Sequence, residues 1–220
     1  MKLCPPLNHA QNSDWSKQYS VAYLVGILPA VLLLTYLTLS FNSPQDVAVY
    51  YKELRTIHTT TTKIMKFISD YGNMMFYSFY IYFFYLGIKT KDKRLWSITL
   101  YYIFFQIVIG VLLVHFLKIS IGRPRPNIEG SFMPFSFNSY YHSAVSGHVT
   151  EISGSALTLS MIYRNMFYSF IFGLCIATMA YSRIYLGQHH ISDTWAGLFF
   201  GSLSAVLIVL FWNKRSLKNG

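Results

Sequence analysis

The chain has 220 residues, of which 53% are hydrophobic, 18% aromatic and only 12% charged, with a formal net charge of +10. Soluble domains carry about 25% charged residues, so this composition excludes an ordinary water-soluble domain and predicts an integral membrane protein. The basic residues occur in short clusters between apolar runs. Membrane proteins use Lys and Arg in this way, whereas a nucleic-acid-binding protein would gather them in one stripe or tail.

Five long runs of the sequence contain no Asp, Glu, Lys or Arg. Each run reaches or approaches the roughly 20 residues that a helix needs to cross about 30 Å of hydrocarbon. Helices are required there because lipid offers the backbone amides no other hydrogen-bond partner. The runs are residues 18–45, 71–88, 95–117, 165–182 and 194–213. We therefore expect one all-α integral membrane domain, a polytopic helix bundle that covers residues 1–220.

Taken in chain order, the runs and their polar boundaries predict six transmembrane helices. Residues 1–18 are expected to form a polar N-terminal arm, and residues 44–63 a polar connection in which Thr59–Thr62 make a turn. No small-residue cleavage pattern follows the first span, so we interpret it as a retained helix and not as a signal peptide. The expected helices are residues 20–41, 64–88, 95–117, 147–163, 166–182 and 192–212.

The fourth expected helix is the least apolar, because it carries Glu151 and several Ser and Thr residues. We expect the other helices to enclose it, and Arg164 and Asn165 to form a tight turn after it. The segment before it, residues 118–145, is rich in Pro, Ser, Asn and Tyr. A loop of this length in a compact protein is typically functional or disordered.

Metal and disulfide chemistry have little support in the sequence. Cys4 and Cys175 are too few and too far apart for a disulfide framework or a zinc site, and Cys175 lies in an apolar run, which indicates packing. Glu129, Glu151 and Asp193 make a thin oxygen set for Mg²⁺. We therefore expect no metal and no cofactor.

The loops between six spans predict which side of the membrane each one faces. The N-terminus, the 89–94 loop, the Arg164 turn and the C-terminal tail fall on one side, which holds most of the basic loop residues. The positive-inside bias makes that side cytoplasmic, so both termini are expected in the cytoplasm. Residues 118–149 and 182–193 then share the opposite face, and these two segments hold the polar clusters described next.

The first cluster is Lys118 with Arg125, which stands between Pro124 and Pro126. Proline fixes its own φ and disfavours the helical region for the residue before it. The segment is therefore stiff and extended, and it presents the Arg125 guanidinium at low entropic cost. Arg matches phosphate oxygens bidentately and Lys supplies a point charge. Contact with lipid headgroups at the membrane interface would also explain these residues.

The second cluster, Ser146-Gly147-His148, lies where a polar loop turns into a helix. A Ser at that junction is a natural N-cap, and the free amides of a helix start form a ready anion site. Gly147 lets the backbone approach a ligand closely, and His148 would lie in the first turn beside it. The alternative interpretation is an ordinary capped helix with an incidental His.

In the third cluster, Ser182-Arg183 precedes His189 and Asp193. His189 and Asp193 are four residues apart, which is one helical turn, so the carboxylate can accept a hydrogen bond from the imidazole. That pairing would fix the tautomer and leave the other ring nitrogen free as a nucleophile. His190 would point elsewhere on a helix, and we interpret it as structural.

The spacing and order of the three clusters resemble the signature of the type-2 phosphatidic-acid phosphatase family, which also includes the vanadium haloperoxidases and the glucose-6-phosphatases. The matching motifs are Lys118-x6-Arg125-Pro126, Ser146-Gly147-His148 and Ser182-Arg183-x5-His189-x3-Asp193. The resemblance spans the C-terminal half of the chain and its membrane frame. Val145 stands where the family usually has Pro, and Arg123 is an extra cation outside the motif.

The resemblance implies a role for each motif residue. His189 would attack phosphorus and form a phosphohistidine, Asp193 would orient it, and His148 would protonate the leaving oxygen and then activate water. The residues that would hold the non-bridging phosphate oxygens are Lys118, Arg125, Ser146, Gly147 through its amide, and Arg183. This set suits phosphoryl transfer, which depends mainly on positioning and charge stabilisation.

We therefore expect an integral-membrane lipid phosphate phosphatase of a bacterial inner membrane, with its site on the periplasmic or extracellular face. Its partners would be the bilayer and a phosphorylated lipid, namely phosphatidylglycerol phosphate, phosphatidic acid, undecaprenyl pyrophosphate or lipid A, of which analogy favours lipid A. A phosphotransferase that passes the phosphate to another lipid would use the same site. A transporter is disfavoured because its site would lie near the membrane midplane. The oligomeric state stays unknown.

Overall fold

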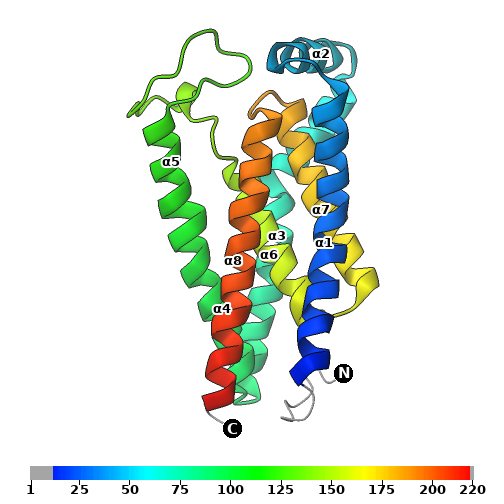
Figure 1. Cartoon of the computed structure of the whole chain (residues 1–220), viewed down its shortest axis with the longest axis vertical. Helices are drawn as coiled ribbons and strands as arrows, with labels where there is room; N and C mark the ends of the chain where they lie inside the picture. Colours follow the sequence, from blue (N-terminus) through cyan, green and yellow to red (C-terminus); the bar gives the residue numbers. More distant parts are fainter. Residues whose placement is uncertain (1–11, 219–220) are drawn as a thin grey trace.

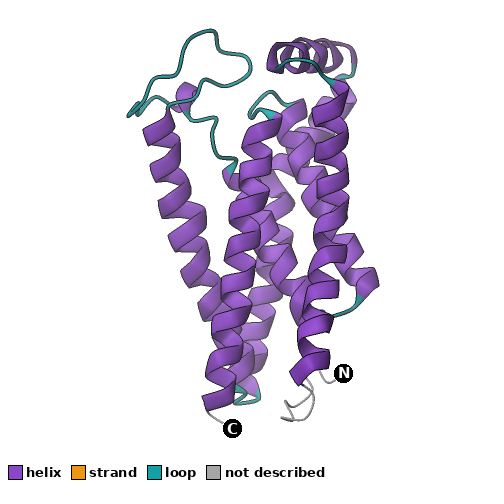
Figure 2. Cartoon of the chain, in the orientation of Figure 1, coloured by secondary structure: helices purple, strands orange, loops and turns teal. Residues whose placement is uncertain are grey.

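The computed structural model describes the backbone of residues 12–218 and the side chains of residues 17–214. Every regular element in that part of the chain is a helix (Figures 1 and 2), which confirms the predicted all-α fold. The elements are α1 (Asn12–Ser40), α2 (Pro44–Ile57), α3 (Thr59–Lys89), α4 (Lys93–Phe105), the π-helix η2 (Gln106–Leu113), α5 (Val114–Ile121), the 3-10 turn η3 (Ser139–Tyr141), α6 (Gly147–Tyr163), α7 (Met166–Tyr185) and α8 (Ile191–Lys218).

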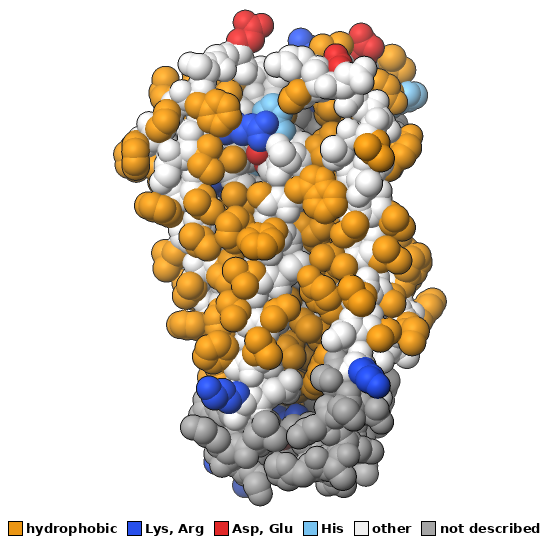
Figure 3. All heavy atoms as spheres, viewed as in Figure 1, with side chains coloured by type: hydrophobic (Ala, Val, Ile, Leu, Met, Phe, Trp, Pro, Cys, Tyr) orange, Lys and Arg blue, Asp and Glu red, His pale blue; other side chains and the backbone are white. Residues whose placement is uncertain are grey.

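Four helical segments of the described chain are long and apolar enough to cross a membrane. They are Lys17–Ser40, Lys93–Ile121, Met166–Tyr185 and Ile191–Lys214. The expected helices 64–88 and 147–163 form as α3 and α6, but neither qualifies on length and apolar character, because α3 is rich in Tyr and α6 has 17 residues with many Ser and Thr. Hydrophobic side chains cover the middle of the face drawn in Figure 3, as the bilayer requires of an integral membrane protein.

Helix α6 is the centre of the bundle. It packs against α8, α7, α1 and α3, and nearly all its side chains from Val149 to Ile162 are buried. Most of its Ser and Thr hydroxyls are tolerated there because they donate to carbonyl oxygens one turn back, as Thr158 Oγ1 does to Gly154 O at 2.7 Å. The Ser153 hydroxyl is the exception, since it is buried without a partner in the described structure. The expectation that the other helices enclose residues 147–163 is confirmed.

Several helix ends differ from the predicted ones. The Thr59–Thr62 segment is not a turn but the first turn of α3, because Thr62 Oγ1 donates to His58 O at 3.0 Å and His58 alone separates α2 from α3. Helix α2 lies across the end of the bundle (Figure 1). The polar arm expected over residues 1–18 lies partly outside the described residues, and its described part from Asn12 is already helical.

Helices α5 and α7 continue past their predicted ends, so that Lys118 and Arg183 lie in the last turns of helices. Helices α4, η2 and α5 form one unbroken rod, since a π-segment changes the register of a helix without ending it. The turn at Arg164 and Asn165 forms as expected, with Arg164 in the left-handed region and the Asn165 side chain capping α7.

Gly122 ends α5 just after Lys118. Its φ is +57°, and a Cβ at this position would lie 1.7 Å from the carbonyl oxygen of Met133. The Gly122 carbonyl also accepts from Met133 N at 2.7 Å. Only glycine therefore lets the long loop double back onto the end of α5.

We predict that Gly122→Ala destabilises the protein by more than the about 1–2 kcal/mol that a left-handed conformation alone costs an L-residue, because the Met133 backbone must also move. Thermal unfolding in detergent measures the loss. Ser120→Ala is the matched control, since the Ser120 hydroxyl is buried without a hydrogen-bond partner in the described structure. An equal unfolding temperature for the two variants would contradict the role given to Gly122.

Candidate active site

The three polar clusters meet at the end of the bundle opposite to the end where α1 begins and α8 ends (Figure 1). Lys118 comes from the last turn of α5 and Arg183 from the last turn of α7, while α6 begins at Gly147 and α8 at Ile191. Near that end, Figure 3 shows Lys or Arg and His side chains together in a hollow of the surface. The predicted convergence on one face is confirmed as a feature of the fold.

Lys118 lies directly over the start of α6. A Cβ built on Gly147 would be 3.3 Å from Lys118 Nζ, so the ammonium group lies beside the first residue of α6. Ser146 occupies the N-cap position as predicted, but its hydroxyl makes no capping bond and is buried without a partner in the described structure. The start of α6 is thus left open to an anion.

The two motif arginines are each held by a neutral side chain. Arg183 donates through Nη1 to Ser69 Oγ of α3, and Arg125 donates through Nη1 to Gln188 Oε1. Their Nε atoms are buried and have no hydrogen-bond partner within residues 17–214. Burial lowers the pKa of the Arg125 guanidinium from its ordinary value. Each arginine therefore keeps donor capacity for a further group.

These cations also lack counter-charges. Among the described side chains, the ion pair present is the one between Arg123 and Asp193, and neither Lys118, Arg125 nor Arg183 has a carboxylate within salt-bridge distance. Holding unpaired charges away from water is costly. The site is therefore complementary to an anion that accepts several hydrogen bonds.

His189 is buried, with 2% of its surface exposed. Its Nδ1 lies 2.6 Å from the carbonyl oxygen of Ser143. A carbonyl can only accept, so Nδ1 carries the proton and Nε2 keeps its lone pair. Burial, followed by the charges of Arg183 and Lys118, holds the His189 pKa well below its usual value, so the ring is neutral at pH 7.

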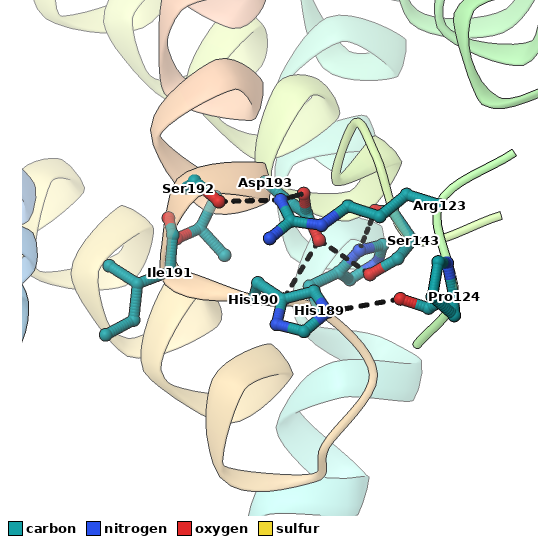
Figure 4. A network of polar contacts seen from close by, with 9 residues as sticks. Arg123, Pro124, Ser143, His189, His190, Ile191, Ser192 and Asp193 are labelled. Atoms are coloured by element: carbon teal, nitrogen blue, oxygen red, sulfur yellow. Dashed lines mark hydrogen bonds and ion pairs between the residues drawn. The ribbon is translucent and has the colours of Figure 1, made fainter. Parts of the chain in front are cut away.

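Asp193 does not make the predicted contact with His189. Its Oδ1 lies 2.7 Å from Arg123 Nη1, and its Oδ2 accepts from Ser143 Oγ at 2.6 Å and from the His190 amide at 2.9 Å (Figure 4). The predicted pairing assumed a helix at both positions, but α8 begins only at Ile191. Asp193 reaches His189 indirectly, because Ser143 binds the carboxylate with its side chain and the imidazole with its carbonyl.

Sequence reasoning missed the neutral residues that position the charged ones. Ser143, Gln188 and Ser69 belong to no motif, and nothing distinguishes them from other Ser and Gln residues along the chain. Arg123 could be noticed in the sequence as a cation outside the motif. In the structure its Nη1 donates to Asp193 Oδ1 and to Ser192 Oγ, both at 2.7 Å.

The remaining polar residues of interest have separate partners. His190 Nε2 lies 3.1 Å from the Pro124 carbonyl (Figure 4), a contact that agrees with the structural interpretation. His148 lies in the first turn of α6 and is half-buried. Glu151, one turn further on, accepts from Asn73 Nδ2 of α3 at 2.5 Å. Within the described residues, His, Cys, Asp and Glu side chains form no group of three that could hold a metal ion.

Comparison with known proteins places the chain in a family. Residues 99–217 match the sequence model of the PAP2 superfamily. The lipid A 1-phosphatases of Rhizobium johnstonii and Rhizobium etli are 32% and 31% identical over 121 residues, which is 53% of this chain and 49% and 51% of those proteins. The lipid A 4′-phosphatase of Porphyromonas gingivalis is 30% identical over 125 residues, 54% of this chain and 53% of that protein.

The chain therefore spans about half the length of the curated relatives it matches. No solved structure matches it. The matched region contains all three polar clusters, and the resemblance inferred from the motifs is confirmed.

We predict that Arg123→Gln destabilises the fold by about 2–3 kcal/mol, less than the ~3–5 kcal/mol expected for a fully buried ion pair, because the Arg123 side chain keeps 20% exposure. The loss arises because Asp193 is left charged and buried. Asp193→Asn in the same protein removes that charge, so the double variant should lose less stability than the sum of the single variants. Thermal unfolding of all four proteins in detergent measures the coupling, and strictly additive losses would argue against the ion pair.

Proposed function

The chain belongs to the PAP2 superfamily, and from this membership and the geometry of the site we propose that it is a membrane lipid phosphate phosphatase that works through a phosphohistidine. The observation that carries the proposal is the set of cations without counter-charges, with Arg183 buried and Lys118 and Arg125 half-buried, beside a histidine whose Nε2 has no hydrogen-bond partner among the described residues. A phosphate group supplies the negative charge and the acceptor oxygens that this set lacks, and its phosphorus is the electrophile that a neutral imidazole can attack.

In the first step, His189 Nε2 would form a bond to phosphorus while the bond from phosphorus to the lipid oxygen breaks. His148 would give its proton to that oxygen, so that the lipid leaves as an alcohol, or as a monophosphate when the substrate is a pyrophosphate. In the second step, His148 would take a proton from water, whose oxygen attacks phosphorus and returns the electron pair to Nε2. Inorganic phosphate is then the product.

The proposed oxyanion ligands are Lys118, Arg125, Arg183, the Ser146 hydroxyl and the Gly147 amide. Their support is the open hydrogen-bonding capacity of Ser146 Oγ and of the two arginine Nε atoms. Preorganised donors of this kind stabilise the charge that builds on the phosphoryl oxygens in the transition state. Asp193 would orient His189 through Ser143, not directly, since Ser143 contacts both.

We propose lipid A as the preferred substrate. The support is the similarity to three lipid A phosphatases, which act on its 1- or 4′-phosphate. Phosphatidic acid, phosphatidylglycerol phosphate and undecaprenyl pyrophosphate share the phosphate chemistry and belong in the same assay. Which phosphate of lipid A reacts is a question for that assay.

We propose a single domain with six membrane-spanning helices, in which α3 and α6 cross together with the four apolar segments. The support is that both run lengthwise within the bundle (Figure 1), and that α6 is enclosed by other helices, which shields its hydroxyls from lipid. The turn between α3 and α4 is basic and lies at the opposite end from the site. The positive-inside bias then puts the site on the periplasmic face of a bacterial inner membrane, with both termini in the cytoplasm.

We predict that His189→Ala lowers the rate of phosphate release by at least about 10³-fold, as expected for loss of a nucleophile. Phosphate release from the four lipid phosphates in detergent measures it, with His58→Ala as the matched control. His58 is an exposed histidine between α2 and α3 whose side chain makes no capping bond. Equal release by wild type and His189→Ala would show that His189 is not the nucleophile, and no release from any lipid by folded wild-type protein would shift the proposal to a phosphotransferase.

We predict that phosphate release survives incubation with excess EDTA, because Lys118, Arg125 and Arg183 supply the charge stabilisation that a metal ion provides in other phosphoryl-transfer enzymes. The measurement is the initial rate before and after dialysis against the chelator. If the chelator abolishes activity and added Mg²⁺ or Zn²⁺ restores it, the metal-independent mechanism is contradicted.

A further inference from the structure

A second polar cavity lies beside the proposed phosphate site, beneath α2. It has a volume of about 710 Å³ and is formed by α2 on one side and by the segment 124–130 of the long loop on the other. Lys52 and Arg55 of α2 line it, together with Arg125, Glu129 and His190. The lining thus holds three cationic side chains and one carboxylate, so the cavity is electropositive. Arg125 belongs both to this cavity and to the proposed phosphate ligands, which makes the two spaces neighbours.

The cavity wall is preformed. Helix α2 begins at Pro44, after an N-cap bond in which Ser43 Oγ accepts from Asp46 N at 3.1 Å, and its buried residues Val47 and Tyr51 pack on the bundle. Arg55 donates to the Tyr185 carbonyl through Nη1 and to Asn127 Oδ1 through Nη2 at 3.2 Å. These bonds fix the guanidinium at the point where α2, α7 and the long loop meet.

An apolar cavity of about 300 Å³ adjoins the polar one. Phe41, Tyr51 and Trp195 line it, and so does His189. Arg55 and His190 line both cavities. An amphiphilic molecule can therefore place an apolar part against α1 and α8, where His189 lines the wall, and a polar part against α2.

The proposed phosphoryl transfer does not use Lys52 or Arg55. Its phosphate ligands are Lys118, Arg125 and Arg183, together with the start of α6. We propose that the cavity beneath α2 binds a second anionic group of the lipid substrate, with Lys52 and Arg55 as its ligands. This inference rests on the proposed function and deepens it, because it gives the substrate two anionic groups. Charge complementarity is its basis, and Arg55, with its fixed planar donors, would supply the directional contacts.

The test compares lipid A that carries both phosphates with the two forms that carry only one. Binding is measured by calorimetry in detergent to the His189→Ala protein, which does not turn the lipids over. We expect the bisphosphorylated lipid to bind at least roughly tenfold more tightly than either monophosphorylated form, a ratio that one charge-assisted contact can supply. Adding Lys52→Gln or Arg55→Gln should reduce that ratio several-fold and leave the binding of the monophosphorylated lipids unchanged.

Controls separate the subsite from general charge and folding effects. Lys63→Gln removes an exposed positive charge of α3 that lines neither cavity, and it should leave the ratio unchanged. Arg55→Gln removes a bond between α2 and α7 and so can disturb folding. Lys52→Gln is the variant expected to keep the fold, because Lys52 is exposed. Arg55→Lys keeps the charge without the planar donors and should retain part of the preference.

The outcomes distinguish this inference from the proposed function. Equal binding of all three lipids, a preference that Lys52→Gln and Arg55→Gln leave intact, or no saturable binding overturns the second anion site. The phosphatase proposal is tested separately by phosphate release from wild-type protein. If wild-type protein releases phosphate but Lys52→Gln and Arg55→Gln leave the binding ratio unchanged, the phosphatase proposal stands and the second anion site is refuted. If the binding preference is present but no phosphate is released, the second anion site stands and the phosphatase proposal is refuted.

Discussion

The structure depends on keeping like charges together at one end of an apolar bundle. Lys118, Arg125 and Arg183 come from three separate elements, and none of them has a carboxylate within salt-bridge distance in the described chain. Apolar packing of the helices below, and neutral acceptors such as Ser69 and Gln188, must offset their repulsion. A carboxylate at this point would relieve the strain on the fold but would compete with a phosphate for the same donors. The unpaired charge is therefore a cost to stability and, in the proposed function, the source of anion affinity.

The same cations contribute, after burial, to the neutral state of His189. Burial first, and then the charges of Arg183 and Lys118, hold the pKa of the His189 imidazole well below its usual value, so the proposed nucleophile stays neutral without a directly bonded carboxylate. Asp193 is instead neutralised by Arg123, and only the dipoles of Ser143 link it to the ring. A carboxylate bonded straight to Nδ1 would raise the proton affinity of Nε2 and weaken this effect. The indirect link orients the ring while leaving the electrostatics of the site to the cations.

The order of the polar clusters along the chain was sufficient to predict where they meet, because uncharged runs mark the helices and their number fixes which ends share a face. The helix 147–163 was predicted at its observed ends, since Gly147 and Arg164 bound it on both sides. The Thr59 turn and the contact between His189 and Asp193 were wrong for one reason. Both depend on tertiary partners, because Thr62 Oγ1 also lies 3.2 Å from the Tyr185 hydroxyl of α7 and the Ser143 carbonyl of the long loop accepts from His189 Nδ1. Local spacing carries no information about such partners.

The division of the chain also indicates where its selectivity lies. The region that matches the family, residues 99–217, contains every residue given a part in the chemistry, so family membership bears on the reaction more than on the lipid. Helix α2 precedes that region, yet it forms one wall of both cavities beside the site. In the sequence it was only a polar connection, because a helix lying across the bundle shows neither a long apolar run nor a motif. The residues that choose the substrate are therefore expected among those for which the motifs give no signal, and α2 is the first place to look for them.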